Sequence, residues 1–200
     1  SKWVALKNAA RETATFFTYY RKESDPLGLF LKNRKFPESP VYRIYERASA
    51  LLSDQLAAKQ GLENELFSSS QNHNEAAGIT ESQIQAISSL NERNVAEQAL
   101  HLESNMTFLA SAVSVSPFLG LLGTVWGVMD SFGGMGMTGA ATLSSIAPGI
   151  TGALLTTIVG LIVALPSTIG YNYLSGNIRT MCIKMDNFAA ELVSDVRLHH

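Results

Sequence analysis

Small and hydroxyl-bearing side chains recur at helical spacing in two long stretches of this sequence that carry almost no charge. In the first stretch the shared face holds Ser114, Pro117, Leu121, Thr124, Gly127 and Ser131. In the second stretch it holds Gly149, Ala153, Thr156, Thr157, Gly160, Ala164 and Ser167. Hydroxyl oxygens are usable ion ligands, so these faces suit a narrow, weakly polar pore wall. They equally suit close packing of two helices in lipid, where small residues let backbones approach.

Packing is the favoured interpretation for the two faces as a whole, because association in lipid depends on close contact. Single hydroxyls add little to packing, which makes Thr124 and Thr157 the best pore candidates. The full set predicted to line a pore is Thr124, Thr157, Thr156, Ser114, Gly127, Gly160, Ala164 and Ser167. Both interpretations stay open at this point.

Other residue patterns give no support to catalysis. Asp130 is an intramembrane carboxylate candidate, although a solvated helix end explains it as well. His73 and His101 have no ligand-type neighbours, and GGMGMTG lacks the lysine and preceding strand of a phosphate loop. We therefore expect no enzymatic activity, no metal and no cofactor. The net charge of -2 gives no basic surface for nucleic acid.

The distribution of charge predicts two membrane spans. Residues 1–106 hold 12 of the 15 Lys and Arg and 13 of the 17 Asp and Glu, whereas residues 107–129 and 131–178 hold none. A helix needs about 20 apolar residues to cross a bilayer. The predicted segments are a helical region at 1–106, a span at 107–132, a loop at 133–145, a span at 146–174 and a C-terminal helix at 175–198.

Lysine and arginine predict the orientation. The loop at 133–145 has neither, while Arg179 and Lys184 follow the second span, so the positive-inside rule places 1–106 and 175–198 in the cytoplasm. The loop is then periplasmic. Pro117 and Pro166 are predicted kinks within the spans. The second span is expected to begin near Pro148.

Apolar residues at helical spacing predict further helices at 2–20 and 41–67. A third helix is expected to begin at Thr80, as N-cap, and to run without a break into the first span. That rod of about 50 residues would measure about 75 Å. The predicted fold is an all-α membrane protein, with long kinked transmembrane helices that extend into a cytoplasmic helical bundle.

Two long motifs carry a family resemblance. LESNMTFLASAVSVSPFLGLLGTVWGVMDSF (102–132) resembles the second transmembrane region of TolQ and ExbB proteins, and APGITGALLTTIVGLIVALPSTIGYNYL (147–174) resembles their third. The chain is thus similar to the MotA/TolQ/ExbB proton channel family. KWVALKNAARE resembles the stretch after the family's first transmembrane helix, which implies that this helix is missing here.

The resemblance implies a multi-pass homopentamer in the bacterial inner membrane, surrounding a central pore. The pore encloses the single span of a TolR- or ExbD-like partner with an essential Asp. Protonmotive force drives ion passage and motion of the partner, and a TolA- or TonB-like protein transmits the work to outer-membrane processes or import. Thr124 in GLLGTVWG and Thr157 in ALLTTIVG correspond to the family's pore threonines, and Pro166 to its third-helix proline.

One residue departs from the family pattern. The family usually has APGIAEAL in its third helix, and this chain has APGITGAL, with Gly152 in place of the glutamate. The alternatives to a proton-driven stator are therefore a non-conducting membrane scaffold and a Na⁺-driven or motility-type stator.

Overall fold

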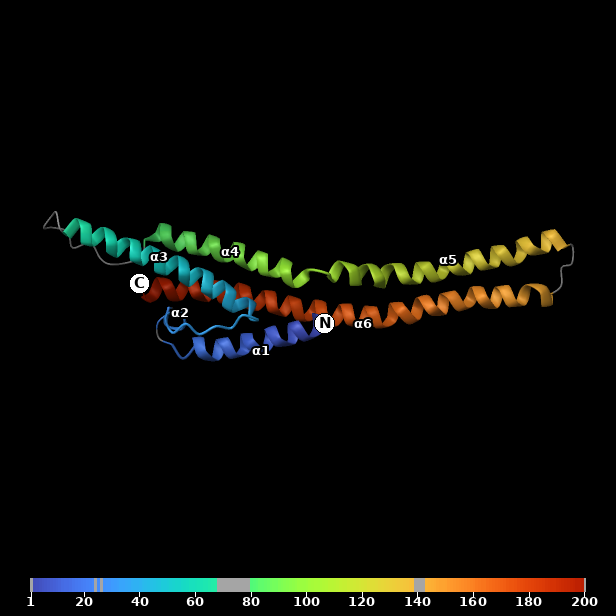
Figure 1. Cartoon of the computed structure of the whole chain (residues 1–200), viewed down its shortest axis with the longest axis horizontal. Coiled ribbons are helices and arrows are strands. Elements are labelled where there is room, and N and C mark those ends of the chain that lie inside the picture. Colours follow the sequence, from blue (N-terminus) through green and yellow to red (C-terminus); the bar gives the residue numbers. More distant parts are fainter. Residues whose placement is uncertain (1, 24, 26, 68–79, 139–142, 200) are drawn as a thin grey trace. The chain divides into compact units, whose positions relative to one another are not determined.

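The computed structural model describes residues 2–23, 25, 27–67, 80–138 and 143–199, and every regular element in that part of the chain is an α-helix (Figure 1). In chain order they are α1 (Lys2–Tyr20), α2 (Gly28–Leu31), α3 (Pro40–Phe67), α4 (Glu81–Glu103), α5 (Met106–Thr138) and α6 (Leu143–His199). The all-α prediction is confirmed, as are the helices predicted at 2–20 and 41–67. The short helix α2 was missed.

The chain divides into two compact units. The bundle unit comprises Ser1–Leu102 and Asn177–His200, and the two-helix unit comprises Glu103–Gly176. The continuous helix α6 contributes its C-terminal part to the first unit and its N-terminal part to the second.

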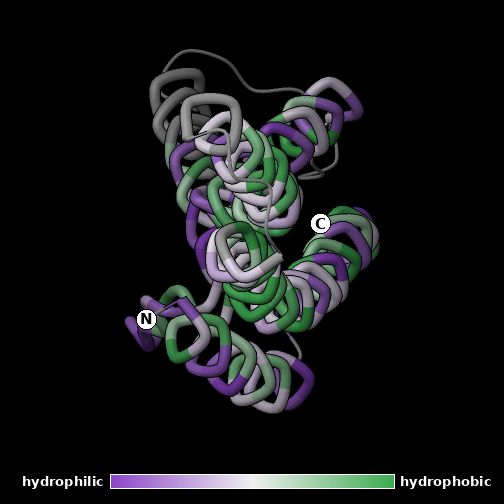
Figure 2. The backbone as a smooth tube through the Cα atoms, turned by 90° about the vertical axis from the view of Figure 1, so that its right-hand side faces the viewer, coloured by the Kyte–Doolittle hydropathy of each residue, from purple (hydrophilic) through white to green (hydrophobic). Residues whose placement is uncertain are grey.

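An aromatic cluster centred on Phe16 forms the core of the bundle unit. Hydrophobic and hydrophilic residues are interspersed along α1 (Figure 2), and Phe16 on its inner face is 0% exposed. The Phe16 ring centroid lies 5.3 Å from that of Phe188 on α6 and 5.5 Å from that of Tyr45 on α3. The other rings around it belong to Phe17, Tyr20, Phe36 and Tyr42. Burial of these large rings ties α1, α3 and α6 together.

Hydrogen bonds fix the direction of α1 against α6. Thr13 Oγ1 donates to Met181 Sδ at 3.8 Å, and the Tyr20 hydroxyl donates to Asp195 Oδ2 at 2.7 Å. Contact positions therefore advance together along both helices, and α1 runs parallel to this part of α6.

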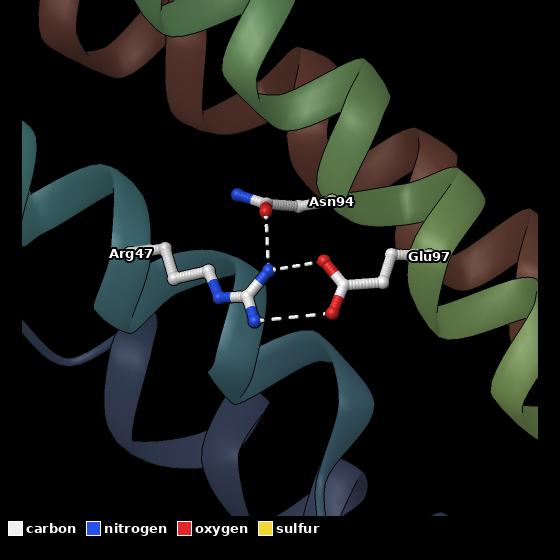
Figure 3. A network of polar contacts seen from close by, with 3 residues as sticks. All are labelled: Arg47, Asn94 and Glu97. Atoms are coloured by element: carbon white, nitrogen blue, oxygen red, sulfur yellow. Dashed lines mark hydrogen bonds and ion pairs between the residues drawn. The ribbon is translucent and has the colours of Figure 1, made fainter.

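The helix α4 runs antiparallel to the same part of α6. Asn91 Nδ2 donates to the Ala189 carbonyl at 3.5 Å, and Arg197 pairs with Glu81 at 2.7 Å. On its other side, α4 is joined to α3 by a forked contact (Figure 3). There the Arg47 guanidinium donates to Asn94 Oδ1 at 2.8 Å and to both Glu97 carboxylate oxygens at 2.5 and 3.2 Å.

The predicted single rod is wrong, because the helix breaks before the first span. α4 ends at Glu103 and α5 begins at Met106. Between them, Asn105 has φ 66°, a left-handed conformation that asparagine tolerates better than most residues and that a continuous helix cannot contain. The predicted start of α4 is correct: Thr80 precedes it, and the Thr80 N–H donates to Gln83 Oε1 at 2.8 Å, one half of a capping box.

Both helices of the two-helix unit extend into the segment predicted as a loop. α5 continues to Thr138, and α6 begins at Leu143 rather than near Pro148. Pro117, Pro148 and Pro166 all lie inside helices that continue past them. The kinks at Pro117 and Pro166 remain predictions.

The apolar side chains of these helices are mostly exposed. Met106–Gly134 and Ile146–Leu198 are each long and apolar enough to cross a membrane, and only 6% of the most apolar stretch of each is buried. A core helix of a soluble protein would be mostly buried. Exposure of this much apolar surface instead fits a lipid or subunit environment.

Tyr20 gives the bundle unit a testable pH dependence. Burial, and then the hydrogen bond to Asp195, raise the pKa of the Tyr20 phenol above its ordinary value of about 10. A raised folded-state pKa means that the stabilisation is complete below pH about 10 and is lost above it, because only the unfolded chain then releases the proton. We expect Tyr20 to lower the free energy of unfolding by up to about 1.4 kcal/mol for each pH unit above 10.

Denaturant titration of the detergent-solubilised chain between pH 9 and about pH 11 measures this loss. Tyr20→Phe should reduce the slope without abolishing it, because burial also raises the pKa of Tyr42 and Tyr45. An unchanged slope in Tyr20→Phe would contradict the assignment.

Candidate functional site

Glycines allow α5 and α6 to approach closely within the two-helix unit. A Cβ atom on Gly160 would lie 2.7 Å from the Ser116 carbonyl oxygen and 3.1 Å from Gly120 Cα. A Cβ on Gly127 would lie 2.7 Å from the Ala153 Cβ, and one on Gly123 would lie 2.5 Å from Thr156 Oγ1. Larger residues at these positions would push the backbones apart.

The close approach brings together threonines that the sequence spaces 33 positions apart. The hydroxyls of Thr124 on α5 and Thr157 on α6 share a hydrogen bond. Thr157 Oγ1 also reaches the Gly120 carbonyl across the contact at 3.0 Å, and Thr124 Oγ1 reaches the Ala153 carbonyl at 3.2 Å. The two best pore candidates are thus direct neighbours.

A third threonine completes this hydroxyl cluster. Thr156 Oγ1 lies 3.1 Å from the Gly120 carbonyl and 2.7 Å from that of Ala153. The Gly120 carbonyl also lies 3.1 Å from Thr124 Oγ1, so three hydroxyls converge on one backbone oxygen. Each hydroxyl has one proton and cannot fill all these bonds at once, so the cluster has alternative hydrogen-bond arrangements.

The chemistry of the cluster is that of uncharged oxygen ligands. Three hydroxyls and two carbonyls can solvate a small cation or orient a water molecule. None of them gains or loses a proton near neutral pH. A carboxylate that stores a proton would have to come from elsewhere.

The other predicted pore residues occupy different surroundings. Ala164 is buried at 6% exposure, Ser114 is exposed, and Ser167 Oγ donates to the Val163 carbonyl of its own helix at 2.7 Å. Gly127 and Gly160 are at the helix contact. Their assignment to a pore wall stays a prediction, since the contacts within one chain show packing and do not define a pore.

A groove beside the contact was not apparent from the sequence. Its volume is about 480 Å³, and its walls are largely apolar. Its lining residues are Ser116, Leu119, Gly120, Gly152, Leu155, Thr156, Val159, Gly160 and Val163. Gly152, the departure from the family pattern, therefore faces this groove, and a Cβ there would meet nothing within 4 Å. The spacing of four residues between Gly152, Thr156 and Gly160 puts them on one face of the helix, and this was the signal that could have placed Gly152 at the groove.

Among the described residues, the hydrogen bonds of the hydroxyl cluster involve neither Asp130 nor His101. Asp130 is exposed on α5, next to Ser131, whose hydroxyl donates to the Gly127 carbonyl at 2.7 Å. His101 is exposed on α4, and His73 lies outside the described residues. Within the part of the chain that the structure describes, no three His, Cys, Asp or Glu side chains gather in a way that could hold a metal.

Comparison with known proteins connects this geometry to a family. The model of the MotA/TolQ/ExbB proton channel family matches residues 54–187, which include the hydroxyl cluster and the groove. The chain belongs to this family. It is 44% identical to the Tol-Pal system protein TolQ of Pseudomonas aeruginosa over 90 residues, 45% of this chain and 39% of the relative.

Two further relatives match a similar length of this chain. TolQ of Haemophilus influenzae is 46% identical over 97 residues, 46% of this chain and 41% of the relative. The biopolymer transport protein ExbB of Salmonella typhimurium is 38% identical over 102 residues, 51% of this chain and 42% of the relative. The chain thus matches about two fifths of the length of these relatives.

The Gly160 contact predicts the effect of one added methyl group. Gly160→Ala would place a Cβ against backbone atoms of α5, which cannot move aside as a flexible side chain could. We therefore expect overpacking to lower the free energy of unfolding by about 1–3 kcal/mol. Gly170→Ala is the matched control, because a Cβ there meets nothing within 4 Å. Because alanine has a higher helix propensity than glycine, this control variant should be as stable as the wild type or slightly more stable. Thermal unfolding in detergent, followed by circular dichroism, compares the two; equal stability would disprove the close contact.

Proposed function

We propose that this chain is the channel-forming subunit of an ion-driven stator of the TolQ/ExbB type. Five copies surround a pore in the bacterial inner membrane, and each contributes α5 and α6. The ring couples protonmotive force to motion of a TolR- or ExbD-like single-span partner. A TolA- or TonB-like protein then transmits this motion to outer-membrane processes or import. Family membership and the two apolar helices support this proposal.

The observation that carries the proposal is the uncharged oxygen cluster of Thr124, Thr156 and Thr157 on otherwise apolar helices. An ion in hydrocarbon needs oxygen ligands, and it must also be able to leave them again in order to pass. Weak ligands with alternative hydrogen bonds meet both requirements. A wall of this kind also lets a partner helix move without breaking strong contacts.

The partner supplies the carboxylate in this mechanism. Asp130 is the only charged residue between Thr107 and Ile178, and it lies near the end of the first span. The essential Asp of the partner helix would bind the proton, and the threonine hydroxyls would solvate it during transfer. The work is therefore mechanical and not enzymatic.

The glycine at position 152 favours two alternatives to a proton-driven stator. Without the glutamate that the family usually has here, the groove has no carboxylate of its own among its lining residues. The first alternative is a membrane scaffold that does not conduct ions and uses α4 as an assembly surface. Such a scaffold would need no carboxylate in the groove. A Na⁺-driven or motility-type stator would rely on the hydroxyl and carbonyl oxygens alone.

Removal of the hydroxyls tests the ion path. We expect Thr124→Val with Thr157→Val to lower partner-dependent ion flux at least tenfold in vesicles containing the full-length protein and its partner, since about 1.4 kcal/mol of lost ion solvation has that effect. Thr168→Val is the matched control, because the Thr168 hydroxyl donates to the Ala164 carbonyl of its own helix, at 2.8 Å. Wild-type flux in the double variant would exclude these threonines from the path. If the wild type also shows no ion flux, in either an H⁺ or a Na⁺ gradient, the result would favour the non-conducting scaffold.

Restoring the family's glutamate tests the groove. Gly152→Glu should fold normally, because the position is open, and should place a carboxylate on the groove wall. We expect partner-dependent proton flux to rise and to become pH-dependent as this group titrates, with Gly152→Gln as the uncharged control. The measurement is the partner-dependent proton flux of both variants between about pH 5 and pH 8. Identical profiles for Glu and Gln would place the groove outside the proton path.

A further inference from the structure

The outer face of α1 differs in chemistry from the face that packs into the bundle. The inner face contains the buried residues Leu6, Ala9, Thr13, Phe16 and Tyr20. The outer face presents Trp3, Lys7 and Arg11 at a spacing of four residues, which aligns them along one side of the first three turns. All three are exposed, and Trp3 is exposed to 49%. We call these three residues the Trp-basic stripe.

The Trp-basic stripe combines an amphipathic ring with positive charge. The Lys7 ammonium lies 5.2 Å from the centroid of the Trp3 ring, within the range of a cation–π interaction. The first eleven residues include Lys2, Lys7 and Arg11 and no Asp or Glu. The next residue, Glu12, accepts a hydrogen bond from the Glu38 N–H at 2.8 Å. The stripe therefore carries a net positive charge.

Packing within the bundle unit shows where the stripe lies. Because α1 runs parallel to α6, with Thr13 at Met181 and Tyr20 at Asp195, the first residues of α1 point toward the end where α6 enters the unit. That entry is at Asn177, three residues beyond the predicted second span at 146–174. The antiparallel helix α4 ends at the same side, just before the first span. Within the bundle unit, the stripe is thus at the end where α4 and α6 connect to the predicted spans.

We propose that the Trp-basic stripe binds anionic phospholipid headgroups of the cytoplasmic leaflet. Its two cations complement the lipid phosphates and anionic headgroups, and a tryptophan ring prefers the boundary between hydrocarbon and water. A second copy of this chain would bring the same positive charges to the stripe and is a poorer occupant. The lipid contact anchors the bundle unit at the bilayer surface. It depends on the membrane spans alone and would hold for a conducting or a non-conducting ring.

Fluorescence of Trp3 tests the contact directly. The 200-residue chain has two tryptophans, so Trp126→Phe makes Trp3 the sole emitter. The chain is reconstituted into phosphatidylcholine vesicles with a constant fraction of phosphatidylglycerol, and either one lipid or the other is brominated near the glycerol end of its acyl chain. Comparing the two quenching curves gives the relative affinity of phosphatidylglycerol over phosphatidylcholine around Trp3. We expect strong quenching and a clear preference for the anionic lipid.

Charge removal identifies the residues responsible. Each cation near an anionic surface contributes about fivefold, so Lys7→Gln with Arg11→Gln should lower the preference by up to about 25-fold, to near one. Added salt should weaken it in the same direction. The matched control is Arg21→Gln with Lys22→Gln, which removes two charges just beyond the far end of α1 and should leave the preference unchanged. Circular dichroism verifies that every variant keeps its helical content.

Three results would overturn the proposal. A Trp3 quenched by aqueous iodide rather than by brominated lipid faces water. A Trp3 shielded from both quenchers is covered by protein, from a second copy or another segment. Equal loss of preference in the Arg21/Lys22 control would show general charge attraction and no role for the stripe.

Discussion

The close approach of α5 and α6 at Gly120 and Gly160 is the constraint on which the rest of the two-helix unit depends. In lipid there is no hydrophobic force to drive two apolar helices together, so short-range packing must hold them. Because glycine has only a hydrogen atom as its side chain, the backbones of the two helices can come into contact at these two positions. Only at that distance can Thr156 and Thr157 donate to a carbonyl of the opposite helix.

The same contact explains both the close packing of the two helices and the convergence of their hydroxyl groups. Glycines supply the proximity, and threonines use it to form a cluster of uncharged oxygens. A hydroxyl bonded to a carbonyl across the contact stabilises the helix pair and remains a potential ion ligand. Packing and ion passage are therefore compatible uses of these residues, and flux measurements distinguish them where geometry alone does not.

The bundle unit is stabilised differently, because its helices bury apolar side chains against one another in a shared core. Rings from α1, α3 and α6 enclose Phe16, and a partly buried phenol–carboxylate hydrogen bond fixes the relative positions of Tyr20 and Asp195. Most of the polar and charged side chains are left for the outer faces. On α1 that outer face becomes chemically distinctive, with an aromatic residue followed by two cations.

The sequence alone determined the helical class and the two apolar spans, and it identified Thr124 and Thr157 as candidates for a pore wall. These follow from composition, periodicity and motif, which are local properties of the chain. It failed at Asn105, where one residue adopts a left-handed conformation and breaks the expected rod. Apolar periodicity on both sides of this residue gives no sign of such a break, since a single dihedral angle changes the path and leaves the pattern intact.

Only the tertiary structure decided which groups meet. The convergence of three hydroxyls on the Gly120 carbonyl depends on the register between two helices. So does the groove that contains Gly152. The Phe16 cluster likewise joins residues up to 172 positions apart. Helical spacing fixes which side chains share a face of one helix, but the distance and register between helices come from the packing of both, and no single segment encodes them.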